Sequence, residues 1–339
     1  MLIETIILNE MRNVTLTAYI QPVKGEFSNI PYRPAILILP GGGYSFCSDR
    51  EADPVAMPYL KAGYQVFILR YSVGANAVWP NPLDDYDQAM EIINTRASEW
   101  HVYNDKIAII GFSAGGHLAG AAAALSKNRP AAAILGYPAV TGETIQMCLP
   151  SAPDIPGAVD RNTCPCFIFA TRDDNVTIVR NVITMIDALD RYGISFECHV
   201  YAYGPHGYST GDASVLAPDT NICDRAGNWV EDSLGWLKDM LGSFGDDKMT
   251  EPRCPNRVND DGGEFLSVDC TLGYLMGQEP AKTILAPIIK DVLEQQGGEQ
   301  QEILGFIKNM KLRDIMSSGK LPPEIQDDIT LQLRTIPSV

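Results

Sequence analysis

Basic side chains are scarce in this sequence. Lysine and arginine together number 26 against 42 aspartates and glutamates, which gives a formal net charge of −16. No basic run or basic amphipathic stretch occurs, and nucleic-acid binding depends on clustered Lys and Arg. We therefore expect no nucleic-acid partner, and we interpret the acidic surface as serving solubility.

Long hydrophobic runs are also missing. None reaches the roughly 20 residues that a membrane-spanning helix needs. The first residues, Met1-Leu-Ile-Glu, lack the basic start and the long apolar core of a secretory signal peptide. We therefore predict a cytoplasmic protein with no membrane partner.

Metal-binding and phosphate-binding patterns are absent. The eight cysteines fit no zinc spacing, and Cys164-Pro-Cys166 is not a Cys-x-x-Cys motif. We expect them to be mostly buried, reduced thiols. No phosphate-binding loop or dinucleotide fingerprint occurs either, so we expect no metal and no cofactor.

The most informative motif that is present is Gly-x-Ser-x-Gly at 111–115, between an apolar run and an alanine-rich helical run. This context is that of a nucleophile elbow, a sharp strand-to-helix turn that exposes a serine above a sheet. Gly111 and Gly115 leave out side chains that would block the turn. The motif predicts Ser113 as a nucleophile. The five residues alone are weak because they also arise by chance, so their partners matter.

The serine also needs a general base, and the sequence contains only four histidines, so the base can be identified by elimination. In the elbow pattern the acid, and then the histidine, follow the serine along the chain. His101 precedes Ser113, and His117 lies on the elbow helix, too near to swing over its own nucleophile. His199 lies within a predicted strand, where we expect it to be a buried core residue. His206 follows the last predicted strand, in a Gly-Pro-His-Gly loop, and we predict it as the general base.

The acid should also follow a strand. Asp173 and Asp174 both do so, and the pattern alone does not separate them. The other aspartate of the pair would then be a turn residue or a helix cap.

Acyl transfer further requires fixed N–H donors for the oxyanion. The elbow pattern places one on the residue after the nucleophile, here Ala114, and another in the loop after the third strand. That loop is Gly41-Gly42-Gly43, where the backbone can approach a substrate closely. We predict an oxyanion hole made by Ala114 with Gly42 or Gly43.

Short apolar runs alternate with helical patterns from residue 35 to residue 241. This alternation predicts an α/β fold, a mostly parallel sheet with helices on both faces. The runs at 3–8 and 14–20 predict an antiparallel pair at one edge of the sheet. Residues 137–163, rich in Pro and Gly, are expected to form an ordered excursion that contributes to a cap over the site.

A composition change predicts a domain boundary. We assign residues 1–245 to a catalytic domain, 246–263 to a polar, turn-rich linker, and 264–339 to a small all-helical module. Its helical patterns cover about 280–295, 299–310 and 322–334. Packing or homo-oligomerisation is one interpretation of this module, and a link to carbohydrate degradation is the other.

Residues 30–240 resemble the acetyl esterase/lipase branch of the α/β-hydrolases, and most closely bacterial carbohydrate esterases of the acetylxylan and feruloyl type. The likeness rests on Pro-Gly-Gly-Gly-Tyr at 40–44, Ser-Asp-Arg-Glu at 48–51, Arg-Tyr-Ser at 70–72, Gly-Phe-Ser-Ala-Gly-Gly-His at 111–117, Thr-Arg-Asp-Asp at 171–174 and Gly-Pro-His-Gly at 204–207. Such sequences place the acid at the second aspartate, which implies Asp174. Pro40 replaces the histidine of the lipase-type His-Gly-Gly-Gly, which changes the expected geometry of the hole. Val176-Thr-Ile replaces the usual Val-Val-Pro after the acid, and we expect this change to affect only the following turn.

These observations predict a serine esterase that acts on small acylated substrates through Ser113, His206 and Asp174. The resemblance favours acetyl groups on oligosaccharides. A peptidase or a general lipase on the same scaffold, and a non-catalytic binding protein, are the alternatives.

Overall fold

The computed structural model describes residues 1–339 except 24, 28, 262, 297–299, 320 and 339. Its contacts divide the chain into an N-terminal unit, residues 1–191 with 195–254, and a C-terminal unit, residues 192–194 with 255–339. The predicted domain limits and the predicted linker at 246–263 stay predictions.

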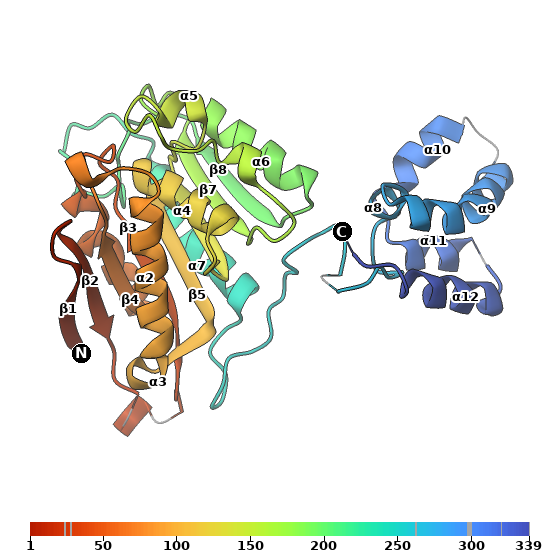
Figure 1. Cartoon of the computed structure of the whole chain (residues 1–339), viewed down its shortest axis with the longest axis horizontal. Helices are drawn as coiled ribbons and strands as arrows, with labels where there is room; N and C mark the ends of the chain where they lie inside the picture. The colour runs from red at the N-terminus through yellow and green to blue at the C-terminus, as the bar shows by residue number, and fades with distance from the viewer. Residues whose placement is uncertain (24, 28, 262, 297–299, 320, 339) are drawn as a thin grey trace. The chain divides into compact units, whose positions relative to one another are not determined.

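An eight-stranded sheet forms the centre of the N-terminal unit, in the order β1-β2-β4-β3-β5-β6-β7-β8 (Figure 1). The strands are β1 (Leu2–Asn9), β2 (Val14–Ile20), β3 (Arg33–Leu39), β4 (Gln65–Arg70), β5 (Val102–Phe112), β6 (Ala132–Gly136), β7 (Cys166–Thr171) and β8 (Phe196–Tyr201). The pairs β1–β2 and β2–β4 are antiparallel, and the other neighbours are parallel. The predicted parallel sheet and its antiparallel edge pair are both confirmed.

Helices cover both faces of this sheet. They are α1 (Asp53–Lys61), α2 (Asn81–Thr95), α3 (Ala97–Trp100), α4 (Ala114–Leu125), α5 (Gly142–Ile145), α6 (Arg180–Arg191) and α7 (Trp229–Leu241). The hydroxyls of Tyr59 on α1 and Ser233 on α7 are hydrogen-bonded at 2.8 Å, which ties these two helices together on one face. Helices α2 and α4 contact each other in front of the sheet in Figure 1.

The sheet places the ends of its central strands at one edge. All seven residues of β3 are buried, as a continuous apolar run requires in a strand covered on both sides. Because β3, β5, β7 and β8 run parallel, the loops after them open at the same edge of the sheet. In such folds ligands bind outside the carboxyl ends of the strands.

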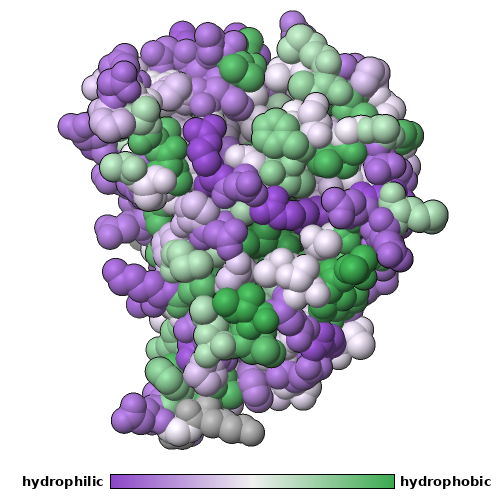
Figure 2. Space-filling view, turned by 90° about the vertical axis from the view of Figure 1, so that its left-hand side faces the viewer, coloured by the Kyte–Doolittle hydropathy of each residue, from purple (hydrophilic) through white to green (hydrophobic). Residues whose placement is uncertain are grey.

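The outer strand β1 leaves apolar side chains uncovered. Ile3 and Ile7 are 54% and 65% exposed. Figure 2 views the molecule from the side on which β1 lies in Figure 1, and apolar side chains there alternate with polar ones. Among the described residues, no helix is both long enough and apolar enough to cross a bilayer.

The cysteines are less buried than the sequence predicts. All eight lie within the described residues, and no disulfide joins any two of them. Cys164, Cys166, Cys223 and Cys270 are buried, whereas Cys148 is exposed and the remaining three are half-buried. The prediction of mostly buried thiols is therefore wrong for half of them.

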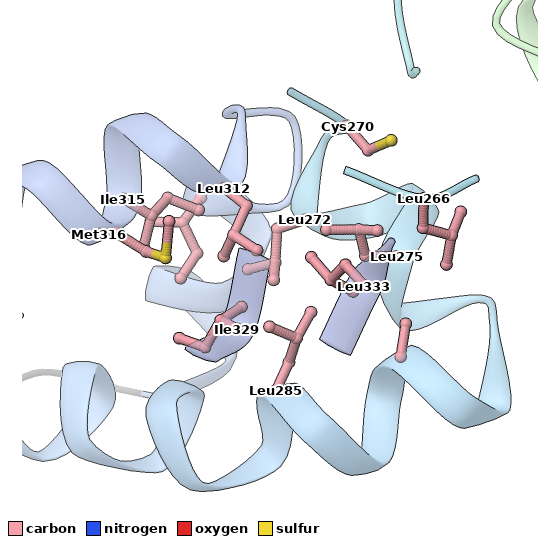
Figure 3. Close-up of a cluster of buried hydrophobic side chains, with 12 residues drawn as sticks. Leu266, Cys270, Leu272, Leu275, Leu285, Leu312, Ile315, Met316, Ile329 and Leu333 are labelled. Carbon is pink, nitrogen blue, oxygen red and sulfur yellow. The ribbon is translucent and has the colours of Figure 1, made fainter. Parts of the chain in front are cut away.

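The C-terminal unit is helical and has a core of its own (Figure 3). Its helices are α8 (Leu272–Met276), α9 (Glu279–Gln296), α10 (Gln300–Ile307), α11 (Leu312–Ser318) and α12 (Pro323–Leu333). Thr271 and Lys311 form an antiparallel bridge just before α8 and α11. The bridge is flanked by two matching bonds, from Leu272 N to Met310 O and from Leu312 N to Cys270 O. Helices α9, α10 and α12 correspond to the predicted patterns, whereas the shorter α8 and α11 were not predicted.

Candidate active site

Ser113 occupies a strained turn between β5 and α4. Its φ of 53° and ψ of −117° lie outside the regions that non-glycine residues favour. A Cβ on Gly111 would lie 2.0 Å from the carbonyl oxygen of Gly115, and one on Gly115 would lie 2.1 Å from that of Leu39. Only glycines fit there, so the chain can turn sharply and present the hydroxyl of Ser113.

The structure brings the predicted serine, histidine and aspartate together. His206 Nε2 lies 2.9 Å from Ser113 Oγ, and His206 Nδ1 lies 2.7 Å from Asp174 Oδ2. Asp173 is exposed, and its carboxylate accepts a bond from Gly204 N at 2.8 Å. Of the two adjacent aspartates, Asp174 contacts the histidine and Asp173 braces the loop that carries it.

Asp174 is held as a carboxylate. Its side chain is buried, and burial alone would raise its pKa. The bond and charge of His206 and the N–H groups of Val176 and Thr177, at 2.8 and 3.0 Å, outweigh burial, and the pKa lies below its ordinary value. Asp174 can therefore accept a hydrogen bond from the protonated Nδ1 of His206.

Thr177 contradicts the expectation that the change at 176–178 affects only the turn after the acid. Its hydroxyl oxygen lies 3.0 Å from Asp174 Oδ2, 3.1 Å from His206 Nδ1 and 2.9 Å from the carbonyl oxygen of Tyr137. The departure at 176–178 therefore does more than alter the turn. It places a hydroxyl beside the contact between the aspartate and the histidine.

The predicted oxyanion donors face the same cavity as Ser113. Gly42 and Gly43 have φ values of 131° and 60°, which favour glycine, and both line the cavity with Ala114. Within the described part of the chain, the N–H groups of these three residues have no hydrogen-bond partner. They are therefore free to bind an oxyanion.

Glu51 is a site residue to which sequence analysis gave no role. Its carboxylate is buried and accepts a bond from Gly41 N at 2.8 Å and one from the Tyr137 hydroxyl at 2.6 Å. The Tyr137 hydroxyl in turn accepts a bond from Ser209 N at 3.1 Å. Burial raises the pKa of Glu51. The residue belongs to the Ser-Asp-Arg-Glu segment at 48–51, and that segment was the only signal for it in the sequence.

The remaining histidines lie outside this constellation. His117 is fully buried, with Nδ1 2.8 Å from the Tyr44 hydroxyl and Nε2 2.9 Å from the carbonyl oxygen of Pro153. His199 was expected to be a core residue, but its side chain is 29% exposed and contacts Glu197 at 2.8 Å. Strand β8 is the last of the sheet, so its residues have a neighbouring strand on one side only.

His117 gives a prediction for stability at acid pH. Its Nε2 donates to the Pro153 carbonyl, and in the neutral ring Nδ1 accepts a bond from the Tyr44 hydroxyl; burial favours this neutral form. Burial lowers the pKa from 6.5 to about 4. The stabilisation is full above about pH 6.5 and is lost as pH falls towards 4, at a cost of up to roughly 3 kcal/mol. We expect urea unfolding midpoints to fall over this range and His117→Gln to flatten the fall. His101→Gln, which changes a partly exposed histidine, should leave it unchanged, and equal slopes in all three proteins would contradict the prediction.

The cavity that Ser113 and His206 share has a volume of about 300 Å³. Its lining is mixed: Phe46, Ile145, Met147 and Val176 are apolar, whereas Ser48, Arg50 and Glu51 are polar or charged. Ile145 and Met147 belong to the predicted excursion 137–163, so this excursion lines the site. Among the described residues, no group of three or more His, Cys, Asp or Glu is placed to hold a metal ion.

Known proteins resemble part of this chain. A family model described as BD-FAE matches residues 26–135. Among curated proteins, endo-1,4-beta-xylanase B of Butyrivibrio fibrisolvens is 30% identical over 53% of this chain and 33% of its own length. Acetylxylan esterase of Xylanibacter ruminicola is 28% identical over 59% of this chain and 46% of its own length. The chain thus spans between a third and a half of these two relatives.

Solved structures match more completely. The α/β-hydrolase MGS-M1, from a Medee basin deep-sea metagenome library, is 42% identical over 70% of this chain and 97% of its own, with a TM-score of 0.65. Carboxylesterase Cest-2923 of Lactobacillus plantarum is 25% identical over the same shares, also with a TM-score of 0.65. With this identity over nearly the whole of a solved α/β-hydrolase, the chain belongs to the α/β-hydrolase superfamily.

Proposed function

We propose that this chain is a serine carboxylic-ester hydrolase that removes short acyl groups, acetyl in particular, from oligosaccharides. One observation carries the hydrolase proposal. Ser113, His206 and Asp174 form a continuous hydrogen-bonded chain, and its serine opens into a cavity lined by unpaired backbone N–H groups. The carbohydrate context is supported by the names of the relatives, a xylanase and an acetylxylan esterase.

The proposed reaction has two halves. Ser113 Oγ attacks the ester carbonyl carbon while His206 Nε2 takes the hydroxyl proton, and Asp174 accepts the Nδ1–H bond that holds the ring. The N–H groups of Ala114 and of Gly42 or Gly43 bind the oxyanion. His206 then gives the proton to the leaving alcohol, which leaves an acyl group on Ser113. Water loses a proton to His206 and attacks this acyl group; the bond to Ser113 Oγ breaks, His206 returns the proton to Oγ, and the acid is released.

The apolar rim of the cavity supports a second candidate, a general esterase for longer acyl groups. Phe46, Met147 and Val176 line the cavity and are 58%, 77% and 55% exposed. Exposed apolar side chains gathered at one site commonly mark a binding surface. They could cover a longer acyl chain as well as the apolar face of a sugar.

Labelling of the serine tests the hydrolase proposal. A fluorophosphonate should modify the protein once, and peptide mapping by mass spectrometry should place the adduct on Ser113. The other serines of the same digest serve as controls. Nitrophenyl esters of increasing acyl length and acetylated xylo-oligosaccharides then separate the two candidates. A steep fall beyond acetyl with release of acetate supports the deacetylase, whereas a rise with acyl length supports the general esterase. No adduct and no turnover of any ester would refute both.

A further inference from the structure

Arg50 stands at the wall of the cavity beside the loop that carries His206. It lies in the 3₁₀ turn Asp49–Glu51 and lines the cavity with Ser113 and His206. Its Nη2 is 3.8 Å from the position that a Cβ on Gly207 would take. Its carbonyl oxygen accepts a bond from Ser209 Oγ at 2.5 Å, which fixes the turn against the His206 loop. The guanidinium therefore sits next to the residue that follows His206.

The acidic neighbours of the Arg50 guanidinium along the chain have other partners, although Glu51 still interacts with it electrostatically. Asp49, the acid before it, pairs with Arg70 at 2.7 Å. Glu51, the acid after it, accepts bonds from Gly41 and Tyr137. Within the described part of the chain, the Arg50 side chain makes no ion pair and no hydrogen bond. Arg50 is exposed, and in a chain of net charge −16 it places a positive charge at the active-site cavity.

The chemistry of the Arg50 guanidinium favours a carboxylate as its ligand. A guanidinium presents a planar fork of donors that matches a carboxylate, and it keeps its charge at any pH the protein meets. Gly207 has no side chain, so nothing at that position covers Arg50. Glu51 also lines the cavity, but its carboxylate already accepts bonds from Gly41 N and the Tyr137 hydroxyl, and burial raises its pKa, which disfavours the charge that would compete for Arg50. The site is thus suited to one anionic group on an otherwise neutral substrate.

The side of the cavity indicates which part of the ester carries this group. In the proposed reaction His206 delivers its proton to the oxygen of the leaving alcohol, so the alcohol lies beside the His206 loop. Arg50 flanks this loop at Gly207. The carboxylate should therefore belong to the alcohol part of the ester.

Resting on the function proposed above, we propose that Arg50 binds a carboxylate on the alcohol part of the ester. The substrates preferred by the enzyme are then acylated hydroxy acids, and an acylated uronic acid is their carbohydrate form. The cavity wall at Arg50 acts as a specificity subsite. It attracts an anion that the overall negative charge of the protein would otherwise repel.

The test compares 3- and 4-acetoxybenzoate with the corresponding acetoxybenzamides, which have the same shape without the charge. We expect wild type to show a higher kcat/KM for the carboxylates, mainly through KM. The carboxylate-to-amide ratio should fall about tenfold or more in Arg50→Gln, as for loss of a charge-assisted bond, and less in Arg50→Lys. Arg180→Gln removes the same charge from an arginine that does not line the cavity, and it should keep the wild-type ratio. The preference should also shrink as salt is raised.

Product inhibition provides a second measurement that does not depend on turnover of the test esters. The inhibition constant of 4-hydroxybenzoate, measured against a nitrophenyl ester, should rise in Arg50→Gln by a similar factor, whereas that of 4-hydroxybenzamide should not. An unchanged carboxylate-to-amide ratio together with unchanged inhibition by 4-hydroxybenzoate would overturn the subsite while leaving the esterase intact. Failure of wild type to hydrolyse any ester would overturn the proposed function, and the subsite with it.

Discussion

Replacing Asp174 by asparagine should lower kcat for ester hydrolysis by about ten thousandfold, with little change in KM. Asp174 Oδ2 lies 2.7 Å from His206 Nδ1, and two backbone N–H groups hold its other oxygen. An asparagine keeps the shape of this site, but its NH₂ group can face Nδ1 and favour the tautomer with the proton on Nε2. That tautomer cannot take a proton from Ser113. In serine proteases with the same arrangement, loss of the aspartate costs about this factor.

Asp173 provides the matched control because it is the same residue type one position away. Its carboxylate accepts a bond from Gly204 N and does not contact His206. We expect Asp173→Asn to lower kcat less than tenfold, since an asparagine oxygen can still accept that bond. Steady-state kinetics on nitrophenyl acetate, with circular dichroism to check folding, would measure both. A larger loss in Asp173→Asn than in Asp174→Asn would mean that the acid is wrongly assigned.

The sequence predicted the class of the fold because buried parallel strands and the elbow leave strong local signals. The apolar run at β3 and the glycines on both sides of Ser113 each meet a requirement that few other residues can meet. His206 could be predicted for a different reason. Histidines are so few that chain order and loop position eliminated the others.

The strand pattern could not show which of Asp173 and Asp174 contacts the histidine. Both follow β7, and adjacent residues share every local preference, so only the turn decides which carboxylate is buried against the histidine. That turn is set by bonds from Val176 and Thr177 back to Asp174. The resemblance to esterases indicated Asp174, whereas the strand pattern alone did not.

Glu51 could not be assigned a role for a related reason. Its two partners, Gly41 and Tyr137, are 10 and 86 residues away along the chain. The contact exists only once β3 and β6 have placed the loops that follow them. Short helices such as α8, with five residues, escaped prediction because such a length does not establish a helical period.

Glu51 connects the two halves of the proposed site. One oxygen fixes the glycine loop through Gly41 N, and the other holds the Tyr137 hydroxyl, which receives Ser209 N from the segment after His206. A Cβ on Gly41 would lie 2.7 Å from the Glu51 carboxylate and 3.1 Å from Ser113 Cβ, so the loop is packed between the two. The carboxylate thus sets where the oxyanion donors lie relative to the serine. Glu51 acts as a positioning residue, since its effect on the reaction passes through this loop.

We therefore expect Glu51→Ala to lower kcat about a hundredfold while KM for a small ester changes only a few-fold. Loss of an oxyanion-hole donor costs between a hundredfold and a thousandfold, and Glu51→Ala should displace the donors without deleting them. Glu51→Gln retains an acceptor for Gly41 N and should recover most of the rate. The variants should also lose affinity for a boronic acid that mimics the tetrahedral intermediate, in proportion to kcat/KM.

Stability alone cannot account for such a result if a second buried carboxylate is changed in parallel. Asp85 is fully buried, accepts a bond from Ser72 N at 2.8 Å and pairs with Arg12 at 2.5 Å, and it does not line the cavity. Asp85→Ala should therefore lower the unfolding midpoint at least as much as Glu51→Ala, because both leave buried donors unpaired. Asp85→Ala should leave the affinity for the boronic acid unchanged. If Glu51→Ala lost stability but kept both kcat and boronate affinity, the carboxylate would serve only to hold the fold together. If boronate affinity fell only in the Glu51 variants, the glycine loop would depend on this carboxylate to bind the oxyanion.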